Sequence, residues 1–262
     1  MTEETHGIGP DAFSLAGRRA LVTGGAAGIG ASVAVALARC GADVAVTRHS
    51  RPADAVVAAI GAAGRRAAVL DADMAGLDPE GAGRLVAETE AALGGIDILV
   101  NNAGIIHRDA AEDFDHAAWR QVLDVNLDAA WLLSQAAGRR MLAAGGGSIV
   151  NIASVLSFQG GVRVPAYAAA KHALAGLTKA LANEWAGRGV AVNAIAPGYT
   201  ATENTAALRA DPERSRDLLA RIPAGRWAEP DDIAGAAVFL ASPAASYVHG
   251  HVLAVDGGWL AR

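Results

Sequence analysis

A tyrosine and a lysine interrupt the largely apolar stretch VPAYAAAKHALAGL at residues 164–177. Tyr167 and Lys171 are four residues apart, so a helix would place them on the same face. A free phenol has a pKa of about 10, and a nearby positive charge favours its ionised form. The pair could therefore transfer a proton to or from a substrate, or it could simply pack inside the protein. The sequence motifs elsewhere in the chain are needed to choose between these two interpretations.

Short apolar runs alternate with helical patterns along the chain. We expect strands at 19–23, 42–47, 66–73, 95–104, 148–154, 190–198 and 251–258, and helices at 28–40, 53–63, 80–93, 116–143, 165–187, 203–220 and 230–241. Gly138 suggests a break within the longest helical region. The strands are continuously rich in Val, Ile, Leu and Ala, which is typical of strands buried on both faces. The pattern predicts a single α/β domain with a Rossmann-like, doubly wound parallel sheet of about seven strands and helices on both faces.

Composition narrows the class of protein. The chain has 262 residues, of which 52% are hydrophobic, and this is enough for one large core. Its net charge of −5 gives no sign of a nucleic-acid or anionic-membrane partner. Cys40 is the single cysteine, which fits a reducing compartment. Residues 1–12 lack a signal-peptide pattern and are interpreted as a loose extension, and no apolar run approaches the roughly 20 residues that span a bilayer. The cytoplasm is the expected location.

In a parallel sheet of this kind, ligands bind beyond the carboxyl ends of the strands. TGGAAGIG at 23–30 follows the first strand, and its glycines would let backbone amides approach a pyrophosphate, although such turns also occur without ligands. NNAG at 101–104 follows the fourth strand and could brace the sheet or border a ligand. Asp71 and Asp73 follow the third strand, where a carboxylate could hold an adenine or cap a turn.

Two further residues lie at informative positions. Ser154 ends the fifth predicted strand, thirteen residues before Tyr167. Asn126 lies inside the long helical region, where asparagine is disfavoured unless its side chain makes a specific bond. Over residues 13–262 the chain resembles the short-chain dehydrogenase/reductase family. The resemblance depends on the order and spacing of TGGAAGIG, NNAG, Asn126, Ser154 and YAAAK.

The resemblance implies an NAD(P)-dependent enzyme that interconverts a secondary alcohol and a ketone. It implies that Tyr167 is the general acid/base and that Lys171 tunes it and holds the cofactor ribose. It also implies that Ser154 binds the substrate oxygen, that Asn126 holds a water for proton relay, and that no metal is required. The cofactor-binding positions that it implies are Gly24, Gly28, Ile29, Gly30, Arg48, Asp73, Met74, Asn101, Ala103, Gly104, Tyr167, Lys171, Pro197, Gly198 and Thr202.

The choice between NAD and NADP stays open at this stage. In NAD enzymes the second strand often ends in an acidic residue that holds the adenosine 2′-hydroxyl, but here Arg48 occupies this place. Arg48, His49 and Arg51 could accept a 2′-phosphate. Against this, Ala27 stands in the glycine loop where many NADP enzymes of the family have a basic residue.

A narrower resemblance concerns the substrate side. Five segments are similar to the type described as 2-deoxy-D-gluconate 3-dehydrogenase or 2-keto-3-deoxygluconate 5-dehydrogenase, which acts on sugar acids and usually uses NAD. They are residues 153–171, 183–186, 193–205, 221–227 and 254–262. It implies a substrate-covering lid at about 199–228. A sugar acid has a carboxylate, which arginine binds bidentately, and several hydroxyls, although an arginine at a strand end can equally point to solvent. The substrate contacts expected on this basis are Ser154, Arg108, Arg163, Gln159 and Asn204.

Other functions are compatible with the same scaffold, because a fold does not determine its substrate. A 3-oxoacyl (acyl-carrier) or general ketone reductase would suit a basic lid. The lid arginines that keep this alternative open are Arg209, Arg214, Arg216 and Arg221. A non-catalytic dinucleotide-binding protein is disfavoured, because the tyrosine, lysine, serine and asparagine are all present. The family resemblance also implies a homotetramer acting on a small-molecule substrate.

Overall fold

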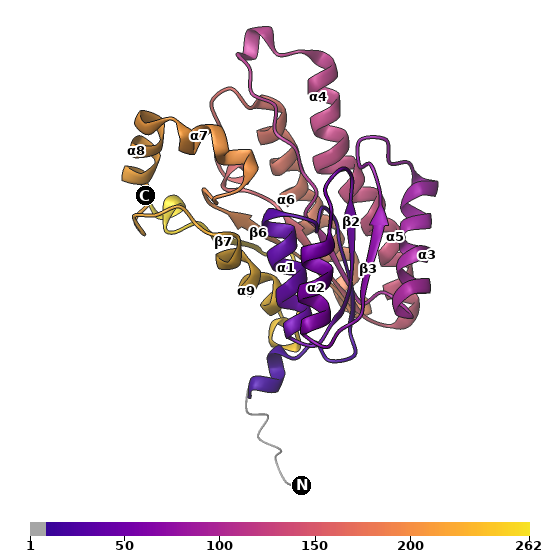
Figure 1. Ribbon diagram of the computed structural model, residues 1–262. Helices are drawn as coiled ribbons and strands as arrows, with labels where there is room; N and C mark the ends of the chain where they lie inside the picture. The colour runs from indigo at the N-terminus through magenta and orange to yellow at the C-terminus, as the bar shows by residue number, and fades with distance from the viewer. Residues whose placement is uncertain (1–8) are drawn as a thin grey trace.

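The computed structural model describes residues 9–262 and shows the expected alternation of strands and helices (Figure 1). The strands are β1 (Arg19–Val22), β2 (Asp43–Arg48), β3 (Ala67–Asp71), β4 (Ile98–Asn101), β5 (Gly147–Ile152), β6 (Val190–Pro197) and β7 (Val252–Val255). The helices are α1 (Gly28–Arg39), α2 (Asp54–Ala62), α3 (Pro79–Leu93), α4 (His116–Leu123), α5 (Ala129–Ala144), α6 (Pro165–Trp185), α7 (Ala206–Ala210), α8 (Pro212–Arg221) and α9 (Pro230–Ala241). The predicted helix at 203–220 is divided, because Asp211 ends α7 and caps α8.

The seven strands form one parallel sheet in the order β3-β2-β1-β4-β5-β6-β7. The chain builds the sheet outward from β1 to β3 and then returns to place β4 on the other side of β1. In such sheets a ligand crevice lies at this switch point, at the carboxyl ends of the strands. The predicted doubly wound sheet is confirmed.

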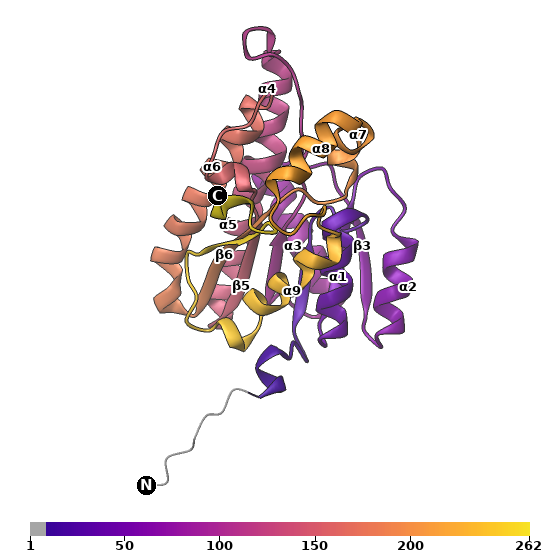
Figure 2. The same cartoon turned by 90° about the vertical axis from the view of Figure 1, so that its left-hand side faces the viewer.

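Two layers of helices cover the sheet, one on each face (Figures 1 and 2). α1, α2 and α9 pack on one face, where Val22, Val46 and Val100 lie in one apolar cluster. α3, α5 and α6 cover the other face, where Leu21 and Leu99 lie in a second cluster. Neighbouring residues of one strand therefore point to opposite faces that are both buried, which explains the unbroken apolar runs.

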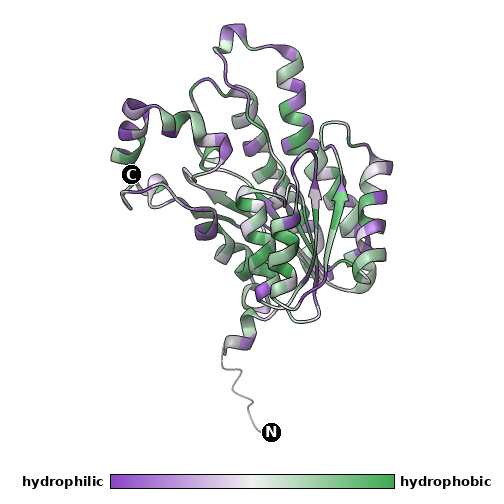
Figure 3. Ribbon diagram, viewed as in Figure 1, coloured by the Kyte–Doolittle hydropathy of each residue, from purple (hydrophilic) through white to green (hydrophobic). Residues whose placement is uncertain are grey.

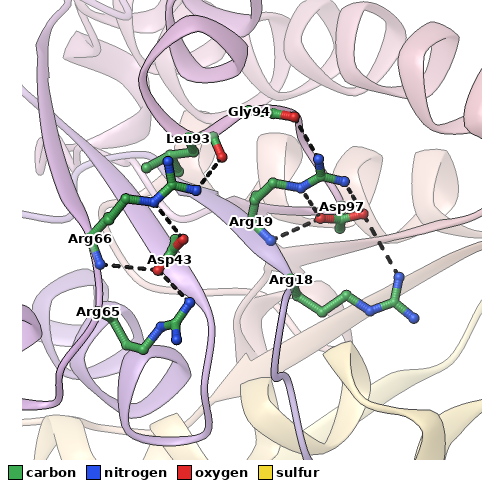
Figure 4. A network of polar contacts seen from close by, with 8 residues as sticks. All are labelled: Arg18, Arg19, Asp43, Arg65, Arg66, Leu93, Gly94 and Asp97. Atoms are coloured by element: carbon green, nitrogen blue, oxygen red, sulfur yellow. Dashed lines mark hydrogen bonds and ion pairs between the residues drawn. The ribbon is translucent and has the colours of Figure 1, made fainter.

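Ion pairs connect residues at the amino ends of the four strands β1, β2, β3 and β4 (Figure 4). This end of the sheet is opposite the crevice. Asp43, the first residue of β2, accepts a hydrogen bond from Arg66 Nε at 2.8 Å and pairs with Arg65 Nη2 at 2.6 Å. Asp97, just before β4, accepts two bonds from the guanidinium of Arg19 at 2.6 and 2.9 Å. Burial acts to raise the pKa of both carboxyls, but the arginine hydrogen bonds hold each pKa below its ordinary value. This edge is therefore fixed by satisfied charges.

The long helical region between β4 and β5 differs from its prediction. It continues through Gly138, and its irregularity is instead a π-helical turn at Asp124–Asp128 between α4 and α5. A Cβ at Gly138 would lie 2.7 Å from the ring of Trp185 on α6. The predicted break at Gly138 is wrong, because this glycine permits the close approach of two helices.

α7 and α8 lie over the carboxyl end of the sheet, within the range expected for the lid (Figures 1 and 2). α8 is mostly polar, as its purple colour in Figure 3 shows, and buries only Leu218. Leu218 and Ile222 join Trp259 and Val155 in a small apolar cluster. This cluster connects α8 to the C-terminal turn and to the residue that follows Ser154.

The extension expected at residues 1–12 lies mostly outside the described residues. Pro10–Phe13 forms a short 3-10 helix, and the Phe13 ring centre lies 6.4 Å from that of Phe239 on α9. Among the helices of residues 9–262, none has both the length and the apolar character needed to cross a membrane.

Replacing Gly138 with Ala is expected to lower the free energy of unfolding by about 1–3 kcal/mol, because the new methyl group would overlap the Trp185 ring. Gly83→Ala in α3 is the matched control, since no atom lies within 4 Å of its added Cβ. The control should gain about 0.5–1 kcal/mol through helix propensity. Denaturant titrations measure both changes, and equal effects at the two sites would contradict the packing role of Gly138.

Candidate active site

A cavity of about 500 Å³ opens at the carboxyl ends of the strands on both sides of the switch point. Most of the predicted cofactor positions line it: Gly24, Gly28, Ile29, Arg48, Asp73, Met74, Ala103, Gly104, Tyr167, Lys171, Pro197, Gly198 and Thr202. Gly30 and Asn101 do not line this cavity. Asn126 and Ser154 do, so the structure brings the four predicted catalytic residues to one cavity.

The turn after β1 has a backbone suited to binding phosphate. Gly24 and Gly28 have φ angles of +60° and +54°, which favour glycine, and the Gly24 N–H donates to Thr47 Oγ1 at 3.0 Å. At Gly30, a Cβ would overlap the Gly24 carbonyl, so glycine lets α1 begin close to the turn. The N-cap residue Ala27 has no polar side chain to satisfy the first amides of α1, which can instead face an anion.

Hydrogen bonds join the turn after β1 to the turn after β4. Asn102 Nδ2 donates to two carbonyl groups of the first turn at 2.8 and 3.2 Å. Thr23 Oγ1 accepts from the N–H groups of Asn102 and Ala103, both at 2.9 Å. Asn101 points into the core instead, where its Nδ2 donates to Asn151 Oδ1 at 2.8 Å. The first asparagine of NNAG thus braces β4 against β5, and the second borders the cavity.

Ser154 begins a 3-10 turn at Val155–Ser157, just after β5. Its Oγ accepts a hydrogen bond from the Leu156 N–H at 3.1 Å, which fixes the position of the oxygen. The hydroxyl hydrogen remains to donate toward the cavity. Ser154 can therefore offer one directed hydrogen bond to a substrate oxygen.

Tyr167 lies in the first turn of α6 and is half-buried beside the cavity. Burial raises the pKa of its phenol, while the Ser154 hydroxyl and the charge of Arg108 act in the opposite direction. The net shift of the phenol pKa is upward. At neutral pH the phenol holds its proton and is a donor.

Lys171 lies one helical turn after Tyr167 and is 4% exposed. Its Nζ donates to the Ile152 carbonyl at 2.6 Å and lies 5.5 Å from the centre of the Tyr167 ring. Burial lowers its pKa to about 8, because the charged form loses its hydration. The ammonium is therefore held beside the phenol and can release a proton at mildly alkaline pH.

Asn126 lies in the π-helical turn between α4 and α5. Its Nδ2 donates to the carbonyls of Val122 at 2.8 Å and Ile105 at 2.9 Å, and the first bond competes with the regular helical ladder. Its Oδ1 is buried, has no partner among the described residues and lies 2.7 Å from where a Cβ of Gly104 would stand. Asn126 thus presents an acceptor at the cavity.

Three basic side chains follow β2 at another part of the cavity wall, and each faces a carboxylate. The pairs are Arg48 with Asp71 at 2.7 Å, His49 with Asp73 at 3.9 Å, and Arg51 with Glu203 of the lid. The first pair also joins neighbouring strands, because its two residues are register partners of β2 and β3. The cations could donate to a phosphate, while the carboxylates oppose one.

The predicted substrate contacts fall into two groups. Ser154 and Asn204 line the cavity, whereas Gln159, Arg108 and Arg163 do not. Gln159 is half-buried in the loop after the Val155–Ser157 turn.

The two candidate arginines differ in what they face. The guanidinium of Arg163 is 62% exposed and pairs with Asp109 at 3.5 Å, and its φ of +63° is unusual for a residue other than glycine. Arg108 donates from Nη2 to the Asn204 carbonyl at 2.8 Å, and its charge lowers the pKa of Tyr167. Of the two arginines, Arg108 is the one whose charge acts on the phenol.

Several cavity residues were not singled out from the sequence. Thr47 carries a weak signal, since it is the polar residue that ends the apolar run VAVT. Asn102 could have been separated from Asn101 by strand alternation, because neighbouring residues point to opposite sides. Glu203 carries no local signal, because its partner Arg51 is far away in the chain.

A family model described as Enoyl-(Acyl carrier protein) reductase matches residues 24–260. The chain belongs to the short-chain dehydrogenase/reductase family. The 2-dehydro-3-deoxy-D-gluconate 5-dehydrogenase of Bacillus subtilis is 56% identical over 254 residues, which are 96% of this chain and 98% of the relative.

Two solved structures of the same family are similar over nearly the whole chain. One is a putative NAD(P)-dependent gluconate 5-dehydrogenase from Beutenbergia cavernae with bound NADP, with 59% identity, a TM-score of 0.91 and coverage of 96% of this chain and 100% of that one. The other is a gluconate 5-dehydrogenase from Burkholderia cenocepacia in complex with NADP and tartrate, with 40% identity, a TM-score of 0.91 and coverage of 96% and 98%.

The cavity fits the dinucleotide used by these oxidoreductases. The glycine loop leaves room that side chains would fill, since a Cβ at Gly28 would lie 3.5 Å from the methyl group of Thr202 across the cavity. The uncapped start of α1 suits the pyrophosphate. Residues 9–262 contain no group of three or more His, Cys, Asp or Glu side chains placed to hold a metal ion.

Replacing Lys171 with Met should change how stability depends on pH. The folded state lowers the lysine pKa from 10.5 to about 8, so between these values the unfolded state binds more protons and folding becomes more favourable as the pH rises. Below the pKa that Lys171 has in the folded state, the lysine is protonated in both the folded and the unfolded protein. The difference in free energy of unfolding between wild type and variant is then constant. Relative to Lys171→Met, the wild-type free energy of unfolding should rise by about 2 kcal/mol from about pH 7.5 to about pH 9.5. Denaturant titrations over this range measure the rise, and a pH-independent difference would show that the lysine is not desolvated.

Proposed function

We propose that this oxidoreductase interconverts a secondary alcohol and a ketone on a deoxy-gluconate-type sugar acid, with NAD or NADP as cofactor. One observation carries the proposal: Asn126, Ser154, Tyr167 and Lys171 meet on the cavity that also contains the glycine loop. They come from the π-helical turn, the end of β5 and α6, so the fold and not chain proximity brings them together.

The chain would hold the cofactor along the cavity wall. The turn after β1 and the start of α1 would bind the pyrophosphate, Asp73 and Met74 would border the adenine, and Lys171 would bind a ribose. Ala103, Gly104 and the segment from Pro197 to Thr202 would border the nicotinamide side. Once bound, the nicotinamide supplies or accepts the hydride, and the protein positions the substrate and moves the proton.

In the reductive direction Ser154 donates its hydroxyl hydrogen to the substrate carbonyl oxygen and fixes it beside Tyr167. The phenol then gives its proton to this oxygen as negative charge develops there, and in the oxidative direction the phenolate takes the proton back. The ammonium of Lys171 beside the ring stabilises the phenolate. Tyr167 therefore acts as acid in one direction and base in the other.

Lys171 and Asn126 would restore the proton of the phenol. With a pKa of about 8, Lys171 can release and regain a proton at little cost near neutral pH. The buried Oδ1 of Asn126 offers an acceptor that could hold one water between the lysine and the cavity. The amide itself does not titrate, so its role would be to position this water.

A carboxylate on the substrate is supported by Arg108 and by the relatives. 2-Dehydro-3-deoxy-D-gluconate and gluconate, named for the relatives above, are both acids. Arg108 lies close enough to Tyr167 for its charge to act on the phenol, whereas Arg163 already faces Asp109. We propose Arg108 as the carboxylate-binding residue, and Gln159 and Asn204 as contacts for hydroxyl groups.

An acyl-carrier reductase is the second candidate, because the description of the matching family model names that substrate. The interleaved acids Asp211, Glu213 and Asp217 dilute the positive charge of the lid that an acyl carrier would require. A sugar acid is therefore the better-supported substrate.

We also infer a homotetramer in the cytoplasm. Trp131 on α5 and Tyr247 before β7 are large apolar side chains that remain exposed at 37% and 97%, which supports coverage by neighbouring subunits. Light scattering of the purified protein measures the mass directly.

Tyr167→Phe should reduce turnover by about 10²–10⁴-fold, because the variant keeps the ring and loses the proton. The dissociation constants of NAD and NADP should stay within about fivefold of wild type, since one lost hydrogen bond is worth about 1 kcal/mol net. Stopped-flow absorbance of the reduced nicotinamide and fluorescence titration give the two quantities. Turnover at the wild-type rate would remove the proposed mechanism.

Arg108→Ala should lower kcat/KM for 2-dehydro-3-deoxy-D-gluconate by about 10–100-fold, as expected for a lost hydrogen-bonded charge pair. Its effect on a neutral ketone should be several times smaller. Arg163→Ala is the matched control and should change both substrates little, because its guanidinium faces Asp109. Steady-state kinetics with both substrates test this, and a larger loss in Arg163→Ala would reverse the assignment.

A further inference from the structure

Residues 202–205, here called the strap, begin the lid and line the cavity. The strap is attached on both sides. On the substrate side, Arg108 Nη2 donates to the Asn204 carbonyl at 2.8 Å. On the other side, the carboxylate of Glu203 pairs with the guanidinium of Arg51, in the loop between β2 and α2. The two attachments connect the strap to the loop after β4 and to the loop between β2 and α2.

The loop that holds Arg51 is also where the adenosine ribose of a dinucleotide lies in sheets of this topology, at the end of the second strand. Arg48 is engaged with Asp71 of the neighbouring strand, so its guanidinium is already oriented by a strand-to-strand pair. Arg51 has no such anchor in the sheet, and its ion pair with Glu203 is solvent-exposed, at 52% and 68% for the two side chains. Arg51 is therefore the more available cation for an added phosphate.

We propose that Glu203 sets the preference between NADP and NAD by competing with the adenosine 2′-phosphate for Arg51. A phosphate that engages Arg51 displaces the Glu203 carboxylate and detaches the strap on this side, and it also approaches a like charge. A ribose with a free 2′-hydroxyl does neither, so the Arg51–Glu203 pair and the strap stay in place. This inference rests on the proposed cofactor cavity and assigns it a positioning residue on the lid.

The size of the effect follows from the exposure of the pair. Exposed ion pairs are typically worth well under about 1 kcal/mol, so removing the competitor should tighten NADP binding by about two- to fivefold. NAD has no phosphate at this position, so its dissociation constant should change by less than about 1.5-fold. Because both charges are exposed, the NADP effect should shrink as salt is added.

The test is a double-mutant cycle on the full chain, with dissociation constants of NADP and NAD measured by isothermal titration calorimetry. The proteins are wild type, Glu203→Gln, Arg51→Gln and the double variant. Glu213→Gln is the matched control, because it removes the same charge from the lid at a residue that does not line the cavity.

The expected result is tighter NADP binding in Glu203→Gln, weaker NADP binding in Arg51→Gln, and a smaller gain when Glu203→Gln is added to Arg51→Gln, because only the like-charge repulsion is then removed. Glu213→Gln should behave as wild type. An equal gain for NAD and NADP, no gain, or the same NADP gain with and without Arg51 would each overturn the proposal. Failure of wild type to bind either nucleotide would instead overturn the proposed function itself.

Discussion

Hydrogen bonds between Thr23 and residues Asn102 and Ala103 join the carboxyl ends of β1 and β4. These two strands form the switch point, on either side of which the chain adds strands to the sheet in opposite directions. β1 and β4 are neighbours in space but 78 residues separate their first bonded side chains, Arg19 and Asp97. A separation of the strand ends at the switch point would move the glycine turn relative to the wall of the cavity that carries Ser154 and Tyr167. The cavity therefore depends on a few side-chain to backbone bonds that no apolar contact could replace.

Solvent exposure decides what the charged groups of this protein do. At the amino edge, Asp43 and Asp97 are paired with arginines and remain ionised. At the carboxyl edge, burial outweighs the groups that face Tyr167 and Lys171 and shifts both pKa values toward the neutral form. Ion pairs thus stabilise the amino end of the sheet. At the carboxyl end, burial leaves Tyr167 and Lys171 with shifted pKa values that suit proton exchange.

The sequence was sufficient for the succession of strands and helices along the chain and for the residues whose signal is local. Continuous apolar strands, the glycine turn and the YAAAK spacing are short-range patterns, and the structure has them at the expected places. Placements that depend on long-range contacts could not be predicted. Gly138 was interpreted as a helix break because the local sequence does not show the contact that requires a glycine there. That contact is with the ring of Trp185 on another helix. Arg163 was the first choice for the substrate carboxylate from the sequence, and the choice of Arg108 depends on their partners, Asp109 and Asn204.

The π-helical turn at Asp124–Asp128 has a consequence for the helices on either side of it. One extra residue within a turn rotates everything after it by about 100° relative to a regular helix. α4 contacts α6, whereas α5 contacts α3 and approaches α6 only around Gly138. A single wide turn thus lets one nearly continuous rod face two partners in different directions. Deleting one residue there would restore a regular helix with the wrong face toward α3, so the rod tolerates substitutions in this turn better than changes in its length.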